Sequence, residues 1–83
     1  MTPEQARTAV SAALNDIAPE IEFASIRGDA PMREQAEIDS FDFLNFLLRL
    51  KETSGVEVPE ADYRKIETLN QLVDYLCKTA GSH

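Results

Sequence analysis

The chain has 83 residues, enough for one small domain with a modest core and too few for the separate binding and catalytic layers of an enzyme. Its net charge of −7 argues against binding to nucleic acid or an anionic membrane, since phosphate binding needs clustered lysine and arginine. Cys77 is the only cysteine, so no intramolecular disulfide can form. We find no secretory signal and no segment long enough to span a membrane, and we therefore expect the cytoplasm as its location. We also expect a monomer.

The first helix signal lies at the N-terminus. Thr2 and Gln5 match the two ends of a capping box, with Pro3 at the first helical position. Apolar residues then recur at helical spacing until Pro19, which predicts a helix over residues 3–16.

A long connection and a second helix follow. Residues 18–38 contain two prolines and one glycine among scattered apolar residues, which predicts a long loop that covers part of the core. Asp39 is the expected N-cap of the next helix, and Asp42 adds negative charge to its first turn. This helix is predicted to end at about Ser54, because Gly55 supplies a stop.

Two further helix starts complete the pattern. Pro59 can open a short third helix that runs to about Lys65, and Thr68 with Gln71 forms a second capping box for a fourth helix. No internal repeat or strand alternation competes with this interpretation.

The sequence therefore predicts an all-α, four-helix bundle with three main helices, one short third helix and a long loop between the first two. Its single domain should span residues 1–80. Residues 81–83, Gly81-Ser82-His83, would form a C-terminal tail whose native origin the sequence leaves open.

The second helix carries more apolar residues than a core requires. They occupy an arc of roughly 220°, whereas a core-facing stripe needs little more than about 100°. One flank should face the core and the other should be surplus, either exposed as a docking patch or covered by the long loop. The two flanks contain Phe43, Phe46 and Leu50 on one side and Phe41, Leu44 and Leu48 on the other.

Ser40 follows the expected N-cap and should be exposed in the first turn of this helix. The unpaired backbone amides there favour an attached anion such as a phosphodiester. Taken alone, Ser40 would more often be an ordinary helix-cap serine. No base lies near it in the sequence, and His83 is the only histidine, so a serine hydrolase is not indicated.

The surrounding segments resemble the acyl carrier proteins over about residues 2–78. The resemblance rests on Asp39-Ser40-Phe41 within residues 37–44, on the Gly-Val-x-Val-Pro turn at 55–59, and on residues 66–69 before the last helix. It implies an acyl-carrier-like fold and a 4′-phosphopantetheine arm esterified to Ser40. A phosphopantetheinyl transferase using Mg²⁺ would take this arm from coenzyme A, and its thiol would carry acyl groups as thioesters. The implied protein is a carrier with no catalytic or metal-binding residues.

The resemblance also implies site residues and partners. The partners are the transferase, an acyl-loading ligase or acyltransferase, and downstream acyl-processing enzymes in a dedicated acyl-transfer, lipid, fatty-acid or polyketide-type pathway. The implied partner contacts are Asp39, Phe41, Asp42, Leu44, Leu48 and Ile66. The implied acyl-pocket residues are Phe43, Phe46, Leu50, Tyr63 and Leu69.

Departures from the family pattern leave the pathway open. Asn45, Arg49, Lys51 and Arg64 stand where fatty-acid carriers commonly have acidic residues. The aromatic residues of the implied pocket leave little room, so we expect a short or polar acyl group, or a chain left outside. The alternatives are an aminoacyl or peptidyl carrier, although the Gly-Gly usual before its serine is missing, and an unmodified acidic helical interaction domain.

Overall fold

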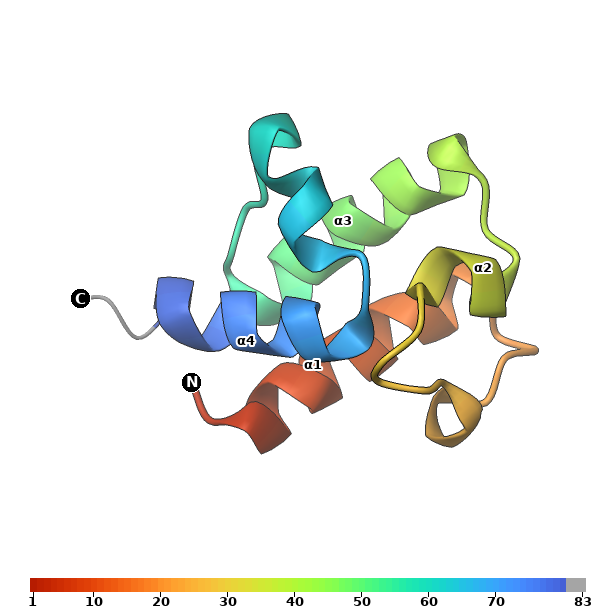
Figure 1. The fold of residues 1–83 in the computed structure, drawn as a ribbon, viewed down its shortest axis with the longest axis horizontal. Coiled ribbons are helices and arrows are strands. Elements are labelled where there is room, and N and C mark those ends of the chain that lie inside the picture. Colours follow the sequence, from red (N-terminus) through yellow and green to blue (C-terminus); the bar gives the residue numbers. More distant parts are fainter. Residues whose placement is uncertain (81–83) are drawn as a thin grey trace.

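Four α-helices and two 3₁₀ helices, with no strand, make up the part of the chain that the computed structural model describes, residues 1–80 (Figure 1). The predicted tail, Gly81-Ser82-His83, lies outside these residues. In chain order the elements are α1 (Pro3–Ile17), η1 (Phe23–Ser25), α2 (Met32–Ala36), α3 (Ser40–Ser54), η2 (Glu60–Ile66) and α4 (Leu69–Ala80). The prediction of an all-α fold is confirmed.

Both predicted capping boxes are present. At the start of α1, the Gln5 backbone N–H donates to Thr2 Oγ1 over 3.2 Å and the Thr2 N–H donates to Gln5 Oε1 over 3.0 Å. Before α4, Gln71 N and Thr68 Oγ1 are 3.1 Å apart, and Thr68 N and Gln71 Oε1 are 3.0 Å apart. These reciprocal bonds satisfy backbone donors that a helix start would leave unpaired, and so they fix where both helices begin.

The long connection between α1 and α3 is more structured than predicted, because it contains η1 and α2. Two backbone hydrogen bonds join it to the segment around the start of α4: Met32 N donates to Glu67 O over 2.9 Å, and Asn70 N donates to Gly28 O over 3.0 Å. At the end of α2, Glu37 adopts a left-handed conformation with φ of 54° and turns the chain toward α3. The predicted short third helix is also present, but as the 3₁₀ helix η2.

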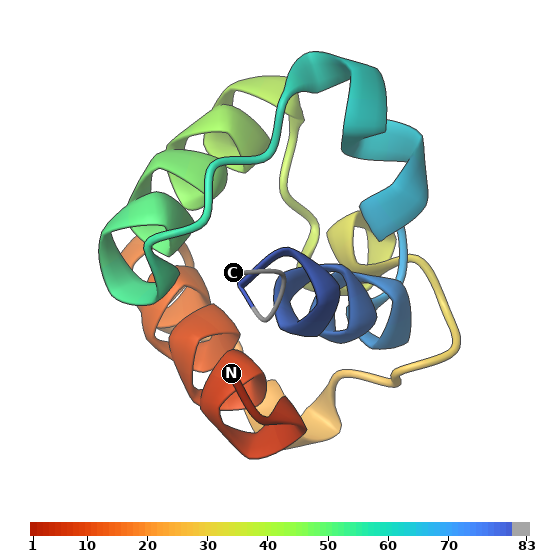
Figure 2. The same ribbon diagram turned by 90° about the vertical axis from the view of Figure 1, so that its left-hand side faces the viewer.

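The core lies between α1, α3 and α4. Figure 2 looks nearly along α4 and shows α1, α3 and η2 arranged around it. The largest side chains with almost no exposed surface are Phe46, Leu14, Met32, Leu50, Ile66, Leu69, Leu72, Leu76 and Val10. Met32 belongs to α2, so this short helix is held by burial as well as by its backbone bonds. None of the helices in residues 1–80 combines the length and the apolar character needed to cross a bilayer.

Candidate functional site

Ser40 is the first residue of α3 and its side chain is exposed. Asp39 precedes it as the N-cap, and Asp39 Oδ1 accepts a hydrogen bond from the Asp42 backbone N–H over 2.8 Å. This bond fixes the start of the helix at Ser40, directly after the N-cap. The hydroxyl is therefore presented to solvent from a rigid element, beside the positive end of the helix dipole.

Arg33 of α2 lies next to this hydroxyl. Its Nη2 donates to Ser40 Oγ over 3.3 Å, and its guanidinium carbon lies 4.9 Å from the centre of the Phe43 ring. The ring contact is a cation–π interaction that orients the guanidinium. The sequence analysis did not identify Arg33. The one feature of the sequence that could have pointed to Arg33 is that it is the only basic residue between Arg27 and Arg49.

The surplus flank of α3 is exposed, which confirms the exposure that one of the two alternatives predicted. Phe41, Leu44 and Leu48 expose 73%, 49% and 62% of their surface, and they are the exposed large hydrophobic residues of the described chain. The other alternative, in which the long loop covers them, is wrong. We call these three residues the apolar patch, and it follows Ser40 along the first turns of α3.

Ile66 requires a correction. The resemblance implied that it contacts partners, but its side chain is 1% exposed and belongs to the core. It is the last residue of η2, and its side chain packs into the hydrophobic core rather than joining the apolar patch on the surface. In this conformation Ile66 has no surface to offer a partner.

An open cleft of about 730 Å³ lies between α2, the first turn of α3 and η2. Arg33, Phe43, Tyr63 and Arg64 line it, together with Ile66 and others. Of the expected acyl-pocket residues, Phe43 and Tyr63 thus reach the cleft.

The remaining expected pocket residues, Phe46, Leu50 and Leu69, have no exposed surface and do not line this cleft. Three aromatic rings, two of which line the cleft, pack against one another. Phe43 lies 5.7 Å from Tyr63 in an edge-to-face arrangement and 6.1 Å from Phe46, measured between ring centres.

A hydrogen bond to α4 holds η2, which forms one side of the cleft. The Tyr75 hydroxyl donates to Asp62 Oδ2 over 2.6 Å, and Lys65 Nζ lies 3.3 Å from Asp62 Oδ1. The bond from Tyr75, helped by Lys65, lowers the pKa of Asp62, and it raises the pKa of Tyr75 because the ionised phenol would face the carboxylate. This contact fixes η2, which carries Tyr63.

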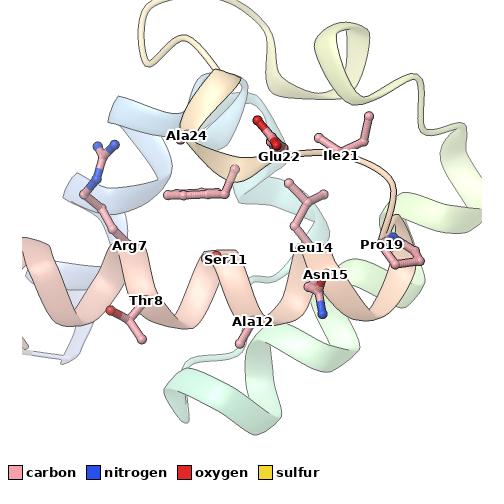
Figure 3. A pocket seen from close by; sticks show the side chains of 11 residues that line it. Arg7, Thr8, Ser11, Ala12, Leu14, Asn15, Pro19, Ile21, Glu22 and Ala24 are labelled. Carbon is pink, nitrogen blue, oxygen red and sulfur yellow. The ribbon is translucent and has the colours of Figure 1, made fainter.

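A second hollow, of about 910 Å³, lies on α1 and the segment around η1 (Figure 3). Arg7 and Phe23 both line this hollow, and the Arg7 guanidinium carbon lies over the Phe23 ring, 5.6 Å from its centre. None of its lining residues belongs to α2, α3 or η2. It is therefore separate from the surroundings of Ser40.

The groups around Ser40 suit a phosphate ester and not a metal centre. They comprise an exposed hydroxyl, a helix N-terminus and a guanidinium, all of which favour an attached anion. Within residues 1–80, no three histidine, cysteine or acidic side chains gather where they could hold a metal ion. The residues present thus fit a covalently attached phosphodiester arm.

Comparison with known proteins gives the same class. The family model described as "Phosphopantetheine attachment site" matches residues 7–76. Acyl carrier protein from Rubrobacter xylanophilus is 32% identical over 56 residues, which cover 68% of this chain and 69% of that protein. Acyl carrier protein from Lactobacillus acidophilus is 30% identical over 62 residues, covering 75% of this chain and 78% of its own length. The corresponding protein from Lactobacillus johnsonii is 31% identical over 51 residues, covering 61% and 64%.

The chain therefore belongs to the acyl carrier protein family of phosphopantetheine-binding proteins. Its cofactor is a covalently attached 4′-phosphopantetheine, and it acts as a carrier rather than as an enzyme. It interacts with the transferase that adds the arm and with acyl-processing enzymes. Neither the peptidyl carrier nor the unmodified interaction domain is favoured by these matches.

Proposed function

We propose that Ser40 carries the 4′-phosphopantetheine arm, and that the protein uses its terminal thiol to deliver acyl thioesters within a dedicated acyl-transfer, lipid or polyketide-type pathway. The observation that supports this most directly is the exposed Ser40 hydroxyl on the first turn of α3, with Arg33 Nη2 3.3 Å from its oxygen. An arm attached there can move freely in solvent, while its attachment point stays fixed by the helix.

The attachment step is a phosphoryl transfer from coenzyme A. Ser40 Oγ forms a bond to the phosphorus next to the pantetheine, and the pyrophosphate P–O bond breaks, releasing adenosine 3′,5′-bisphosphate. The hydroxyl proton passes to a base of the transferase, because nothing among the contacts of Ser40 accepts it: Arg33 is a donor only. The chain itself therefore presents and orients the nucleophile, and the transferase supplies the chemistry.

The apolar patch is the proposed docking surface for the enzymes that load and unload the arm. Phe41, Leu44 and Leu48 are exposed beside Ser40, and a large exposed aromatic with neighbouring leucines is typical of a binding surface. Asp39 and Asp42 would add charge contacts to basic partners at the same end of α3. Ile66 would contribute only if docking moved η2.

We further propose that the acyl group is short or polar, or stays outside the fold. The ring contacts of Phe43 with Phe46 and Tyr63 support this, and so does the complete burial of the remaining expected pocket residues. A comparison of NMR shifts between the arm-bearing and octanoyl-loaded forms tests it. Changes confined to residues that line the cleft would support the proposal, whereas large changes at the buried Phe46, Leu50 and Leu69 would contradict it.

Intact mass spectrometry tests the carrier function. The protein is incubated with coenzyme A, Mg²⁺ and a broad-specificity phosphopantetheinyl transferase, beside Ser40→Ala and the matched control Ser54→Ala. Ser54 lies at the opposite end of the same helix. A gain equal to the mass of the arm in wild type and Ser54→Ala, and none in Ser40→Ala, is the expected result. An equal gain in Ser40→Ala would contradict the proposal.

A further inference from the structure

The sequence around Ser40 is strongly acidic apart from one side chain. Five acidic residues and a single basic one, Arg33, lie between Arg27 and Arg49 in the sequence. A phosphodiester at Ser40 places another negative charge among them, next to Asp39 and Asp42. Without a compensating cation, the attached group would be repelled by its own surroundings.

Arg33 is placed to compensate this charge. Its Nη2 lies 3.3 Å from the oxygen that the arm esterifies, so the non-bridging phosphate oxygens would lie within reach of the same guanidinium. Among residues 1–80, Arg33 has no carboxylate within salt-bridge distance, unlike Arg27 and Arg49, which pair with Asp29 and Glu52. Its donors are therefore available to a new anion.

Two contacts of α2 reduce the freedom of Arg33. The guanidinium lies on the Phe43 ring, and the helix beneath it is anchored by the buried Met32. A planar guanidinium held in this way loses little further freedom when it binds phosphate oxygens, and arginine can bind two of them at once. An ordinary surface arginine lacks this preorganisation.

We propose that Arg33 binds the phosphodiester of the arm at Ser40, which rests on the proposed attachment at Ser40. The charged contact joins α2 to the first turn of α3 in the arm-bearing protein and stabilises it. Arg33 also lines the cleft with Tyr63 and Arg64, so a phosphodiester that it binds would lie near the cleft.

The first test uses wild-type protein and needs no variant. The side-chain Nε–H resonance of Arg33 is compared by NMR before and after attachment of the arm, with that of Arg49 as an internal control. Arg49 lies nine residues along α3, about 13 Å from Ser40. We expect a clear shift for Arg33 and none for Arg49. An unchanged Arg33 resonance on protein whose mass proves modification overturns the inference and leaves the attachment at Ser40 intact.

The second test compares variants. Arm attachment should raise the melting temperature of wild type and of Arg49→Gln by roughly 1 to 8 °C more than that of Arg33→Gln, as expected for an exposed ion pair in a domain of this size. Arg33→Lys, which keeps the charge but not the planar fork, should fall between them. The ³¹P resonance of the arm should move in Arg33→Gln but not in Arg49→Gln. Equal melting increments and equal ³¹P shifts would overturn the role of Arg33, and a failure of Ser40 to be modified at all would overturn both proposals.

Discussion

Replacing Leu50 and Leu48 separately by alanine distinguishes the two flanks of α3. The two residues share a helix and a side-chain chemistry, but Leu50 has no exposed surface and Leu48 exposes 62% of its own. Truncating a fully buried leucine costs about 2–5 kcal/mol, through lost burial and a residual cavity. Full burial of a leucine side chain is worth about 1.5–3 kcal/mol. Leu48 is buried over little more than a third of its surface, so its truncation to alanine should cost less than about 1 kcal/mol.

Urea unfolding followed by circular dichroism measures both costs under the same conditions. We expect the unfolding midpoint to fall sharply for Leu50→Ala and only slightly for Leu48→Ala, with similar slopes in both variants. A loss for Leu48→Ala as large as that for Leu50→Ala would show that Leu48 is packed against other residues. The apolar patch would then not be a free docking surface, and the argument from exposure would be refuted.

Three further predictions concern charge and the helix start. Tyr75→Phe removes the hydrogen bond that lowers the pKa of Asp62. A lowered carboxyl pKa stabilises the folded protein at pH values above the unfolded-state pKa. This stabilisation is lost as the pH falls through the folded-state pKa. The stability difference between Tyr75→Phe and wild type should therefore be largest near neutral pH and shrink in strong acid, and a pH-independent difference in urea unfolding would contradict this. Asp39→Ala should lower the unfolding free energy by about 1 kcal/mol, because the N-cap bond to the Asp42 N–H is lost. Asp39→Asn should retain most of this stabilisation, because asparagine also caps helices well. Equal losses of stability for the two variants in thermal unfolding would count against a capping role. Because the net charge is −7, Mg²⁺ or an increase from low to physiological ionic strength should raise the melting temperature, and a melting temperature insensitive to both would show that repulsion does not limit stability.

The helix starts were predictable because their signals are local. The bonds between Thr2 and Gln5, and between Thr68 and Gln71, join residues three apart, so the short sequence pattern contains both partners. Gly55 likewise ends α3 in a left-handed conformation with φ of 75°, which glycine adopts without strain. The width of the apolar arc on α3 similarly predicted a surplus flank, but whether that flank was exposed or covered by the long loop was known only from the structure.

The short elements were not predictable in the same way. A five-residue helix such as α2 is too short to be stable by itself, and it depends on the buried Met32 and on the bond from its backbone to Glu67. Glu67 lies more than thirty residues away from α2 in the sequence. The inward direction of Ile66 has the same origin, since it depends on how η2 packs on α4.

The placement of Arg33 follows from these distant contacts. Only after α2 forms and the left-handed Glu37 turns the chain does the guanidinium reach Ser40. The sequence predicted the exposed serine and its helix start, and the structure added the cation beside it. The residue with the most direct contact to the Ser40 hydroxyl was therefore the one that pattern reasoning passed over.

The measurement that tests the central claim most directly is localisation of the arm. Protein loaded by the transferase is digested, and the peptides are fragmented by tandem mass spectrometry. We expect the arm on the peptide that contains Ser40, with characteristic loss of the phosphopantetheine fragment from that residue alone. An arm located on Ser25, Ser54 or any other residue would contradict the assignment of Ser40 as the point where this carrier holds its acyl groups.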